Sequence, residues 1–281
     1  MEIRKLRKEE HDCTRALWEE IFPEDTKEFL DYYYSVKVAE NEIYVIEEDD
    51  RIVSMLHLNP YEMRVKEQIY HTHYIVAVAT DVKYRRRGYM ATLLNHVMKI
   101  MQERGEPFTF LMPASEAIYK PFGFIFIYEQ GRSTLTGKCI NDDELVIEEA
   151  TEADCGQMAD FANAFLKEHD VVTWRSAEYY RMILEEQKSE KGGILLVKRN
   201  GRLQGILCYA REEELEIREP LCECEADLEY AIFYLAGGKE AEVVCVGYGG
   251  EERKPLIMAK VLQPEFDMEL KNAKVFLNEV V

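Results

Sequence analysis

The spacing of hydrophobic residues along the first half of the chain predicts strands that alternate with helices. Apolar side chains at helical intervals predict helices at 9–20, 25–38, 89–102 and 113–119. Runs rich in β-branched and aromatic residues predict strands at 1–6, 42–48, 51–58, 70–80, 108–112 and 124–128. Asp49 and Asp50 stand between two of these strands as a hairpin turn, and Gly105 ends the third helix.

A similar order returns more weakly in the second half, after a polar stretch at 132–144 that we interpret as a linker. The hydrophobic pattern predicts strands at 145–151, 194–198, 202–209, 215–218, 241–246 and 256–262 and helices at 152–168, 176–186 and 224–235. Asn200 and Gly201 are a strong hairpin signal. We therefore expect an α/β (α+β) protein of two tandem domains, 1–135 and 145–281. Each has a mixed central sheet flanked by helices, and the second is a degenerate copy of the first.

The charge balance adds information about partners. The chain of 281 residues has a net charge of −19, which argues against nucleic-acid binding because phosphate contacts need a basic face. Residues 1–140 carry 23 acidic and 19 basic residues, a net of −4, and 141–281 carry 31 and 16, a net of −15. An acidic half would attract cationic substrates. The alternative is that this charge only keeps the surface solvated.

Composition also indicates where in the cell the protein is expected. No apolar run approaches the roughly 18 residues of a membrane span, and the N-terminus has no apolar segment typical of a secretory signal. Seven scattered cysteines are an odd number, which favours reduced thiols and a cytoplasmic protein. His71 and His73 have no third ligand at a recognisable spacing, and Cys222 and Cys224 have no second pair. We expect no metal site.

The stretch that carries chemistry is YIVAVATDVKYRRRGYMATLLNHVM, residues 74–98. A strand of small and β-branched residues runs into a basic turn and then into a helix. Unpaired amides at such a helix start, together with the helix dipole, bind pyrophosphate. Gly88 permits close approach of the backbone to the anion, and Arg85, Arg86 and Arg87 add positive charge and phosphate-matching guanidinium groups.

This stretch resembles the GNAT superfamily of N-acetyltransferases, whose signature is Gln/Arg-x-x-Gly-x-Gly/Ala. Arg85 and Gly88 fit that pattern, whereas Met90 replaces the usual small residue. The resemblance implies acetyl-CoA as co-substrate. It also implies a set of cofactor-binding residues on the strand, turn and helix start: Val76, Ala77, Val78, Arg85, Arg86, Arg87, Gly88, Tyr89 and Met90.

Two segments resemble the enhanced-intracellular-survival (Eis) acetyltransferases more narrowly. They are VATDVKYRRRGYM within the same stretch and MPASEAIYKPFGF at 112–124. The second half resembles the degenerate domain of that family, with PLIMAKVL at 255–262 as its clearest segment. Eis proteins usually end in a third, sterol-carrier-like domain, and we expect this chain, which stops at Val281, to lack it. Eis relatives form hexamers, so a homo-oligomer is an open expectation.

The resemblance also suggests catalytic roles. The backbone N–H of Val78 would bind the thioester oxygen, and Tyr119 would be the general acid for the CoA thiolate. Tyrosines in aromatic-rich segments otherwise serve packing. The general base is left open between the terminal carboxylate of Val281, Glu279, His73 and a water chain.

The leading hypothesis is acetyl transfer to a primary amine of a small cationic acceptor, such as an aminoglycoside or a polyamine. One alternative is acetylation of a lysine or an N-terminus on a protein. Another is a non-catalytic, acyl-CoA-binding regulatory module. No glycine-containing turn follows the strand at 215–218, so we expect one cofactor site per chain, in the first half. Neither nucleic acid nor a membrane is an expected partner.

Overall fold

The computed structural model describes residues 2–211, 214–250, 252–266 and 270–278, and it shows the expected mixed α/β fold. The chain divides into two compact units. Unit 1 comprises Met1–Tyr128, His169–Trp174 and Leu256–Val281, and unit 2 comprises Glu129–Glu168 and Arg175–Pro255. These units interleave along the chain. The division into functional domains at 1–135 and 145–281 stays a prediction.

Unit 1 is built on a mixed sheet with the strand order β1-β2-β3-β4-β5-β13. Its strands are β1 (Ile3–Lys5), β2 (Glu42–Glu48), β3 (Arg51–Val65), β4 (Gln68–Thr80), β5 (Phe108–Leu111) and the end of β13 (Glu252–Val261). Two short strands that the sequence pattern missed, β8 (Val171–Thr173) and β14 (Val275–Phe276), extend unit 1 beside the far end of β3. Neighbours in the main sheet run antiparallel, except that β4 and β5 are parallel.

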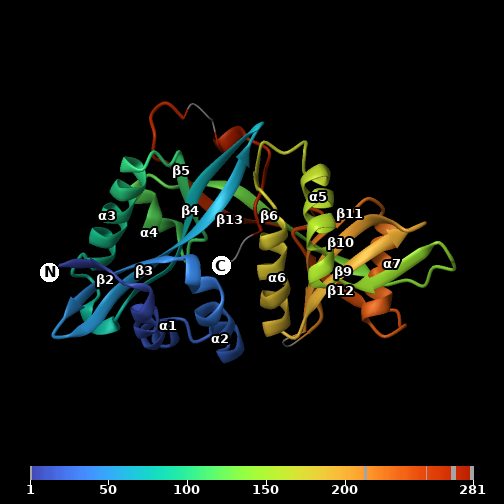
Figure 1. Ribbon diagram of the computed structural model, residues 1–281, viewed down its shortest axis with the longest axis horizontal. Coiled ribbons are helices and arrows are strands. Elements are labelled where there is room, and N and C mark those ends of the chain that lie inside the picture. Colours follow the sequence, from blue (N-terminus) through green and yellow to red (C-terminus); the bar gives the residue numbers. More distant parts are fainter. Residues whose placement is uncertain (1, 212–213, 251, 267–269, 279–281) are drawn as a thin grey trace. The chain divides into compact units, whose positions relative to one another are not determined.

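The helices of unit 1 cover both faces of this sheet (Figure 1). They are α1 (Arg15–Ile21), α2 (Lys27–Ser35), α3 (Tyr89–Glu103) and α4 (Glu116–Tyr119), with 3₁₀ turns at Lys8–Thr14, Lys37–Glu40, Val82–Tyr84 and Lys120–Phe122. Successive side chains of β2 point to opposite faces. Tyr44 meets His96 of α3, whereas Val45 belongs to the core cluster with Trp18 of α1 and Tyr33 of α2.

Strand β3 is longer than predicted because a proline within it is tolerated. Pro60 lies beyond Leu58, the last residue of β3 that pairs with β2, and before Met63, the first that pairs with β8. On this side of β3 the ladder is interrupted, and a residue without an N–H can occupy the gap. The sequence pattern ended the strand at 58, two residues before this proline.

Unit 2 has the strand order β6-β12-β11-β10-β9-β7. Its strands are β6 (Ile125–Thr136), β7 (Leu145–Glu149), β9 (Gly193–Arg199), β10 (Arg202–Ala210), β11 (Glu216–Cys222) and β12 (Glu242–Val246), and its helices are α5 (Cys155–Phe165), α6 (Ala177–Ser189) and α7 (Glu225–Leu235). The predicted linker at 132–144 is wrong in its first part, because 132–136 pair with β12. Ser133 is buried there, so polar composition concealed a strand.

Both units contain the same irregularity in the strand before their parallel partner. In β4, Ala77 and Val78 together oppose Leu56 of β3. In β11, Glu219 and Pro220 together oppose Leu207 of β10. Each bulge begins with a left-handed non-glycine residue, Ala77 at φ +51° and Glu219 at φ +47°. This shared feature supports the interpretation that unit 2 repeats the architecture of unit 1.

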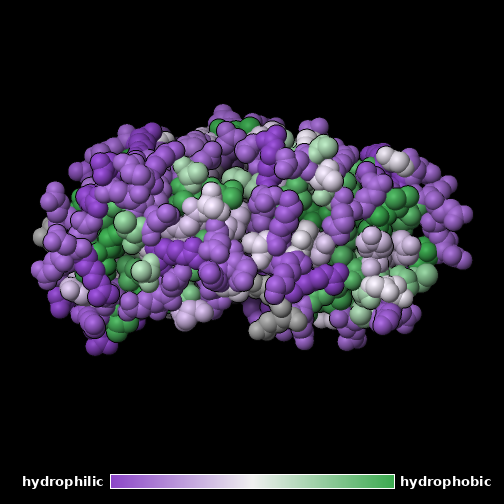
Figure 2. All heavy atoms as spheres, turned by 60° about the horizontal axis from the view of Figure 1, so that its bottom comes forward, coloured by the Kyte–Doolittle hydropathy of each residue, from purple (hydrophilic) through white to green (hydrophobic). Residues whose placement is uncertain are grey.

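Hydrophilic residues predominate on the face shown in Figure 2, and hydrophobic residues occur among them. In the part of the chain that the structure describes, no helix is long and apolar enough to span a membrane. All seven cysteines are free thiols.

Candidate functional site

The predicted site lies where β4 and β5 separate. The two strands share one ladder pair among the described residues, Tyr74 with Phe110. Beyond that pair β5 ends at Leu111, whereas β4 continues to Thr80. We call this opening the strand fork and the Tyr74–Phe110 pair its vertex. Past the vertex, the edge of β4 that faces away from β3 has no strand partner in the described structure.

The bulge lies on this open part of β4. Ala77 adopts a left-handed conformation that costs a non-glycine residue roughly 1 kcal/mol or more, a cost that clusters at functional sites. Val76 and Val78 are half-buried beside it. An unpaired strand edge can bind an extended ligand through main-chain hydrogen bonds, as in strand addition. The three predicted backbone-binding residues therefore lie together on one accessible edge.

The basic turn follows directly, and we call residues 82–88 the phosphate turn. Arg86 and Gly88 both have positive φ angles, +64° and +84°, and Gly88 is the N-cap of α3. The first intrahelical bond runs from the Thr92 amide to the Gly88 carbonyl, 2.9 Å. The amides of the first three residues of α3 thus precede the helical ladder, and the first turn contains no acidic residue. The turn can receive a phosphate.

The three arginines of this turn are exposed but differently held. Arg85 donates from Nε to the Thr80 carbonyl at 3.2 Å. Arg87 stacks over the ring of Tyr84 at 4.8 Å. Arg86 makes no ion pair in the described part of the chain. Its guanidinium is therefore available to an incoming anion.

Residues that the motif did not reveal hold the phosphate turn from the β2–β3 hairpin. Buried Asp81 accepts a hydrogen bond from the Lys83 amide, 2.8 Å, and Arg51 Nη2 approaches its other oxygen to 2.8 Å as an ion pair. Glu48 accepts the hydroxyl of Tyr89 and lies 3.7 Å from Arg87 Nη1. Tyr89 therefore offers its amide, not its hydroxyl, to a ligand. Asp81 was detectable in principle as a cap before the turn.

Tyr119 ends the short helix α4 and is only 6% exposed. Its ring packs edge-on against Phe124, with centroids 6.0 Å apart. Burial raises the pKa of the hydroxyl to about 12. The hydroxyl makes no hydrogen bond within the described residues and is protonated at neutral pH, so it is free to donate to a ligand.

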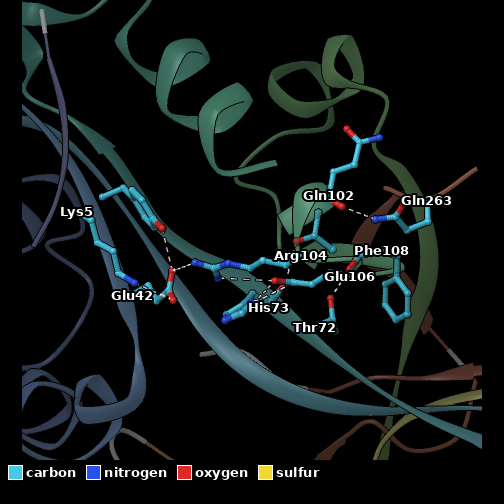
Figure 3. Close-up of polar contacts among 11 residues, drawn as sticks. Lys5, Glu42, Thr72, His73, Gln102, Arg104, Glu106, Phe108 and Gln263 are labelled. Atoms are coloured by element: carbon cyan, nitrogen blue, oxygen red, sulfur yellow. Dashed lines mark hydrogen bonds and ion pairs between the residues drawn. The ribbon is translucent and has the colours of Figure 1, made fainter. Parts of the chain in front are cut away.

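Buried His73 lies at one end of a network of hydrogen bonds and ion pairs on the α3 face of β4 (Figure 3). Its Nδ1 is 2.9 Å from both carboxylate oxygens of Glu106. Arg104 connects Glu106 to Glu42, and hydrogen bonds from Arg104, Lys5 and Tyr44 outweigh burial and lower the pKa of Glu42 to about 2. The network gives His73 a structural partner on one ring nitrogen.

The other candidate bases, Glu279 and Val281, lie outside the described residues. The chain just before them belongs to unit 1. Tyr128 donates its hydroxyl to Asn278 Oδ1 at 2.9 Å, and Phe276 packs against the ring of Tyr128. His71 packs edge-on against His73 at 5.4 Å, and no group of three or more metal-ligating side chains lies together among the residues described.

Residues 2–127 match the family model described as Acetyltransferase (GNAT) domain. These residues contain the fork, the phosphate turn and Tyr119. Residues 2–127 form a GNAT acetyltransferase domain. The matched family is one of acetyltransferases, and such enzymes use acyl-CoA. No curated protein matches the chain at a significant level.

Solved structures share the fold over nearly the whole chain. A probable N-acyltransferase from Enterococcus faecalis V583 is 15% identical with a TM-score of 0.79, covering 94% of this chain and 73% of that one. Eis1 from Mycobacterium abscessus is 11% identical with a TM-score of 0.62, covering 93% and 73%. A tandem GNAT protein from the clavulanic acid biosynthesis pathway is 12% identical with a TM-score of 0.59, covering 94% and 99%. The fold of tandem GNAT units is thereby confirmed.

Unit 2 does not reproduce the features that equip the GNAT domain for a ligand. At its bulge, Pro220 stands where β4 has Val78, so the corresponding backbone N–H is missing. Helix α7 begins directly after β11, and its first turn carries Glu225 and Asp227. Carboxylates at a helix start repel phosphate.

Proposed function

We propose that the chain is an acetyl-CoA-dependent N-acetyltransferase that acts on a primary amine. The observation that carries this proposal is the continuity of three features in unit 1: a phosphate turn, an unpaired strand edge and a buried tyrosine that is protonated. Each feature would bind one part of acetyl-CoA: the phosphate turn the diphosphate, the strand edge the amide-bearing pantetheine arm, and the tyrosine the sulfur.

The residues support a defined orientation of acetyl-CoA. The diphosphate would accept hydrogen bonds from the amides at the start of α3 and ion pairs from Arg85, Arg86 and Arg87. The backbone of Val76–Val78 on the open edge of β4 would bind the pantetheine arm and the acetyl group. The N–H of Val78 would stabilise the oxyanion of the thioester.

The proposed reaction is direct attack on the thioester. The neutral amine nitrogen bonds to the carbonyl carbon, the carbon–sulfur bond breaks, and the electron pair leaves on sulfur. Tyr119 donates a hydrogen bond to that sulfur. A pKa of about 12 makes full proton transfer uphill, since a thiol ordinarily has a pKa of about 8.5. Stabilising the departing thiolate is therefore its first role.

For the acceptor we propose a small cationic amine, an aminoglycoside-like or polyamine-like molecule. The net charge of −19 favours the encounter with cations. The attacking nitrogen must lose a proton, and Glu279, the Val281 carboxylate, His73 and a water chain are the groups we consider as its acceptor.

The decisive experiment measures thiol release from acetyl-CoA with a panel of aminoglycosides, polyamines and lysine peptides. We expect turnover with at least one small polyamine or aminoglycoside. In Tyr119→Phe, kcat should fall roughly 10- to 100-fold, with little change in acetyl-CoA affinity. A fall of this size corresponds to the free energy that one hydrogen bond to a charged atom contributes.

Tyr70→Phe is the matched control, because it removes a hydroxyl from β4 at the end away from the fork. Turnover by Tyr119→Phe equal to that of the unchanged protein would exclude the proposed role of Tyr119. Release with peptides alone would favour the protein-acetylating alternative. Binding of CoA without release by any amine would indicate a regulatory module.

A further inference from the structure

Three buried aromatic rings close the strand fork on the α2 side. The rings of Tyr74 and Phe110 lie 5.0 Å apart at 30°, directly across the vertex. Tyr61 of β3 packs edge-on against both, at 6.0 Å from Tyr74 and 5.7 Å from Phe110. All three side chains are buried. We call them the aromatic wall.

The opposite face of the vertex is filled as well. His73 and Glu106 are buried there and joined by a hydrogen bond, as Figure 3 shows. The hydroxyl of Thr109 on β5 donates to the His73 carbonyl at 2.8 Å and ties the strands together just behind the vertex. A group entering the fork from its open end therefore meets side chains on both faces.

The length of β4 sets where an acyl group would stop. From Val78, whose N–H would hold the thioester oxygen, to Tyr74 the strand runs four residues, about 13 Å at roughly 3.3 Å per residue. An acetyl group held at Val78 stops short of the rings at the vertex. A longer acyl chain that follows this edge would end close to the aromatic wall.

We propose that Tyr61, Tyr74 and Phe110 determine the acyl-chain length that the enzyme accepts. This inference rests on the proposed function and adds its donor specificity. Acetyl and propionyl groups fit in front of the wall. A chain of eight carbons must displace a buried ring or the His73–Glu106 pair. Displacing close-packed side chains in a protein interior costs free energy.

Phe110→Leu tests the proposal, because it removes one ring of the aromatic wall and leaves a smaller apolar side chain in its place. The measured quantity is the ratio of kcat/KM for octanoyl-CoA to kcat/KM for acetyl-CoA. We expect this ratio to rise at least about tenfold, in the range that pocket contacts produce. The ratio does not depend on the fraction of enzyme that is folded, so a loss of stability does not obscure the result.

Phe108→Leu is the matched control. Phe108 lies on the same strand and is equally buried, but it lies behind the vertex, with its ring centroid 5.5 Å from that of Phe266 and 6.3 Å from that of Phe110. Its ratio should stay close to that of the unchanged protein, because Phe110 keeps its own ring. A second variant, Tyr74→Leu, should shift the ratio in the same direction as Phe110→Leu.

The outcomes separate this inference from the proposed function. Equal use of acetyl-, butyryl- and octanoyl-CoA by the unchanged protein would overturn the role of the wall while leaving acyl transfer intact. An unchanged ratio in both Phe110→Leu and Tyr74→Leu would overturn it too. Failure to use any acyl-CoA with any amine would refute the proposed function itself.

Discussion

At the scale of single residues, His57 on β3 shows how burial controls a titratable group. Its side chain is fully buried, and its Nδ1 shares a hydrogen bond of 3.0 Å with the Tyr33 hydroxyl. The same hydroxyl donates to Asn59 and accepts from Asn41. Burial, with a smaller effect of His11, lowers the pKa of His57 to about 3. The ring is therefore neutral in the folded protein at all ordinary pH values.

This pKa predicts a loss of stability in mild acid. Between pH 6.5 and 3 the unfolded chain binds a proton at His57 that the folded chain excludes, so stability falls as the pH decreases. The contribution approaches about 1.4 kcal/mol per pH unit below the unfolded pKa. Urea unfolding at pH 7 and pH 5 should show a smaller pH-dependent loss in His57→Asn than in the unchanged protein. His71→Asn, at an exposed position, serves as control. Identical losses in all three proteins would contradict the prediction.

The motif points to the residues that we propose to face the ligand, but not to the residues that hold them in place. Arg85, Arg86, Gly88 and the β4 strand were recognisable because phosphate binding needs those residue types at that spacing. Asp81 looked like an ordinary turn residue. Its importance depends on Arg51, which is thirty positions away and reaches it only through the pairing of β3 with β4. A local sequence pattern contains no information about such a contact.

At the scale of elements, the β2–β3 hairpin fixes the phosphate turn from two sides. Arg51 reaches Asp81 at the beginning of the turn, and Glu48 reaches Tyr89 and Arg87 at its end. The hairpin turn between them, Asp49 and Asp50, has positive φ angles of 52° and 58°, which match the twist of its strands. The hairpin thus holds the phosphate turn in place from outside the proposed binding residues.

Asp81 variants should separate the contributions of its two contacts, the hydrogen bond from the Lys83 amide and the ion pair with Arg51. Asp81→Asn keeps an oxygen for the Lys83 amide but loses the charge opposite Arg51, and Asp81→Ala loses both contacts. We expect KM for acetyl-CoA to rise about 3- to 10-fold in the first and more in the second, with kcat nearly unchanged. Steady-state kinetics with acetyl-CoA as the varied substrate measures both constants. Asp50→Asn, in the adjacent hairpin turn, should match the unchanged protein. A fall in kcat without a rise in KM would refute the anchoring role.

Strands and helices with strong local patterns were predicted, and elements that depend on distant partners were not. Helix α3 was found because its apolar residues recur regularly between Gly88 and Gly105. β8 and β14 were missed because three- and two-residue strands have no pattern of their own and exist through pairing with β3 and with each other. The end of β6 was taken as linker because its polar residues become buried only beside β12.

At the scale of the whole molecule, the fold is repeated but the candidate site residues of unit 1 are not repeated in unit 2. Both units retain the bulge beside a parallel pair of strands, since it belongs to the path of the backbone. Unit 2 replaces Val78 by Pro220 and has no glycine-containing basic turn before α7. Buried Arg175 reaches Glu219 at the bulge itself. That carboxylate is thus engaged by the protein.

These differences predict one acyl-CoA site per chain, which titration calorimetry with CoA can count. The stoichiometry should be near one, and Gly88→Val should abolish binding, because φ +84° strains a β-branched residue and distorts the amides at the start of α3. Gly201→Val makes a matched control. It places the same strained residue, at φ +74°, in the β9–β10 turn of unit 2. Since no ligand group is expected there, that variant should bind CoA like the unchanged protein. A stoichiometry near two, or residual binding in folded Gly88→Val, would show that unit 2 binds CoA despite its proline and its acidic helix start.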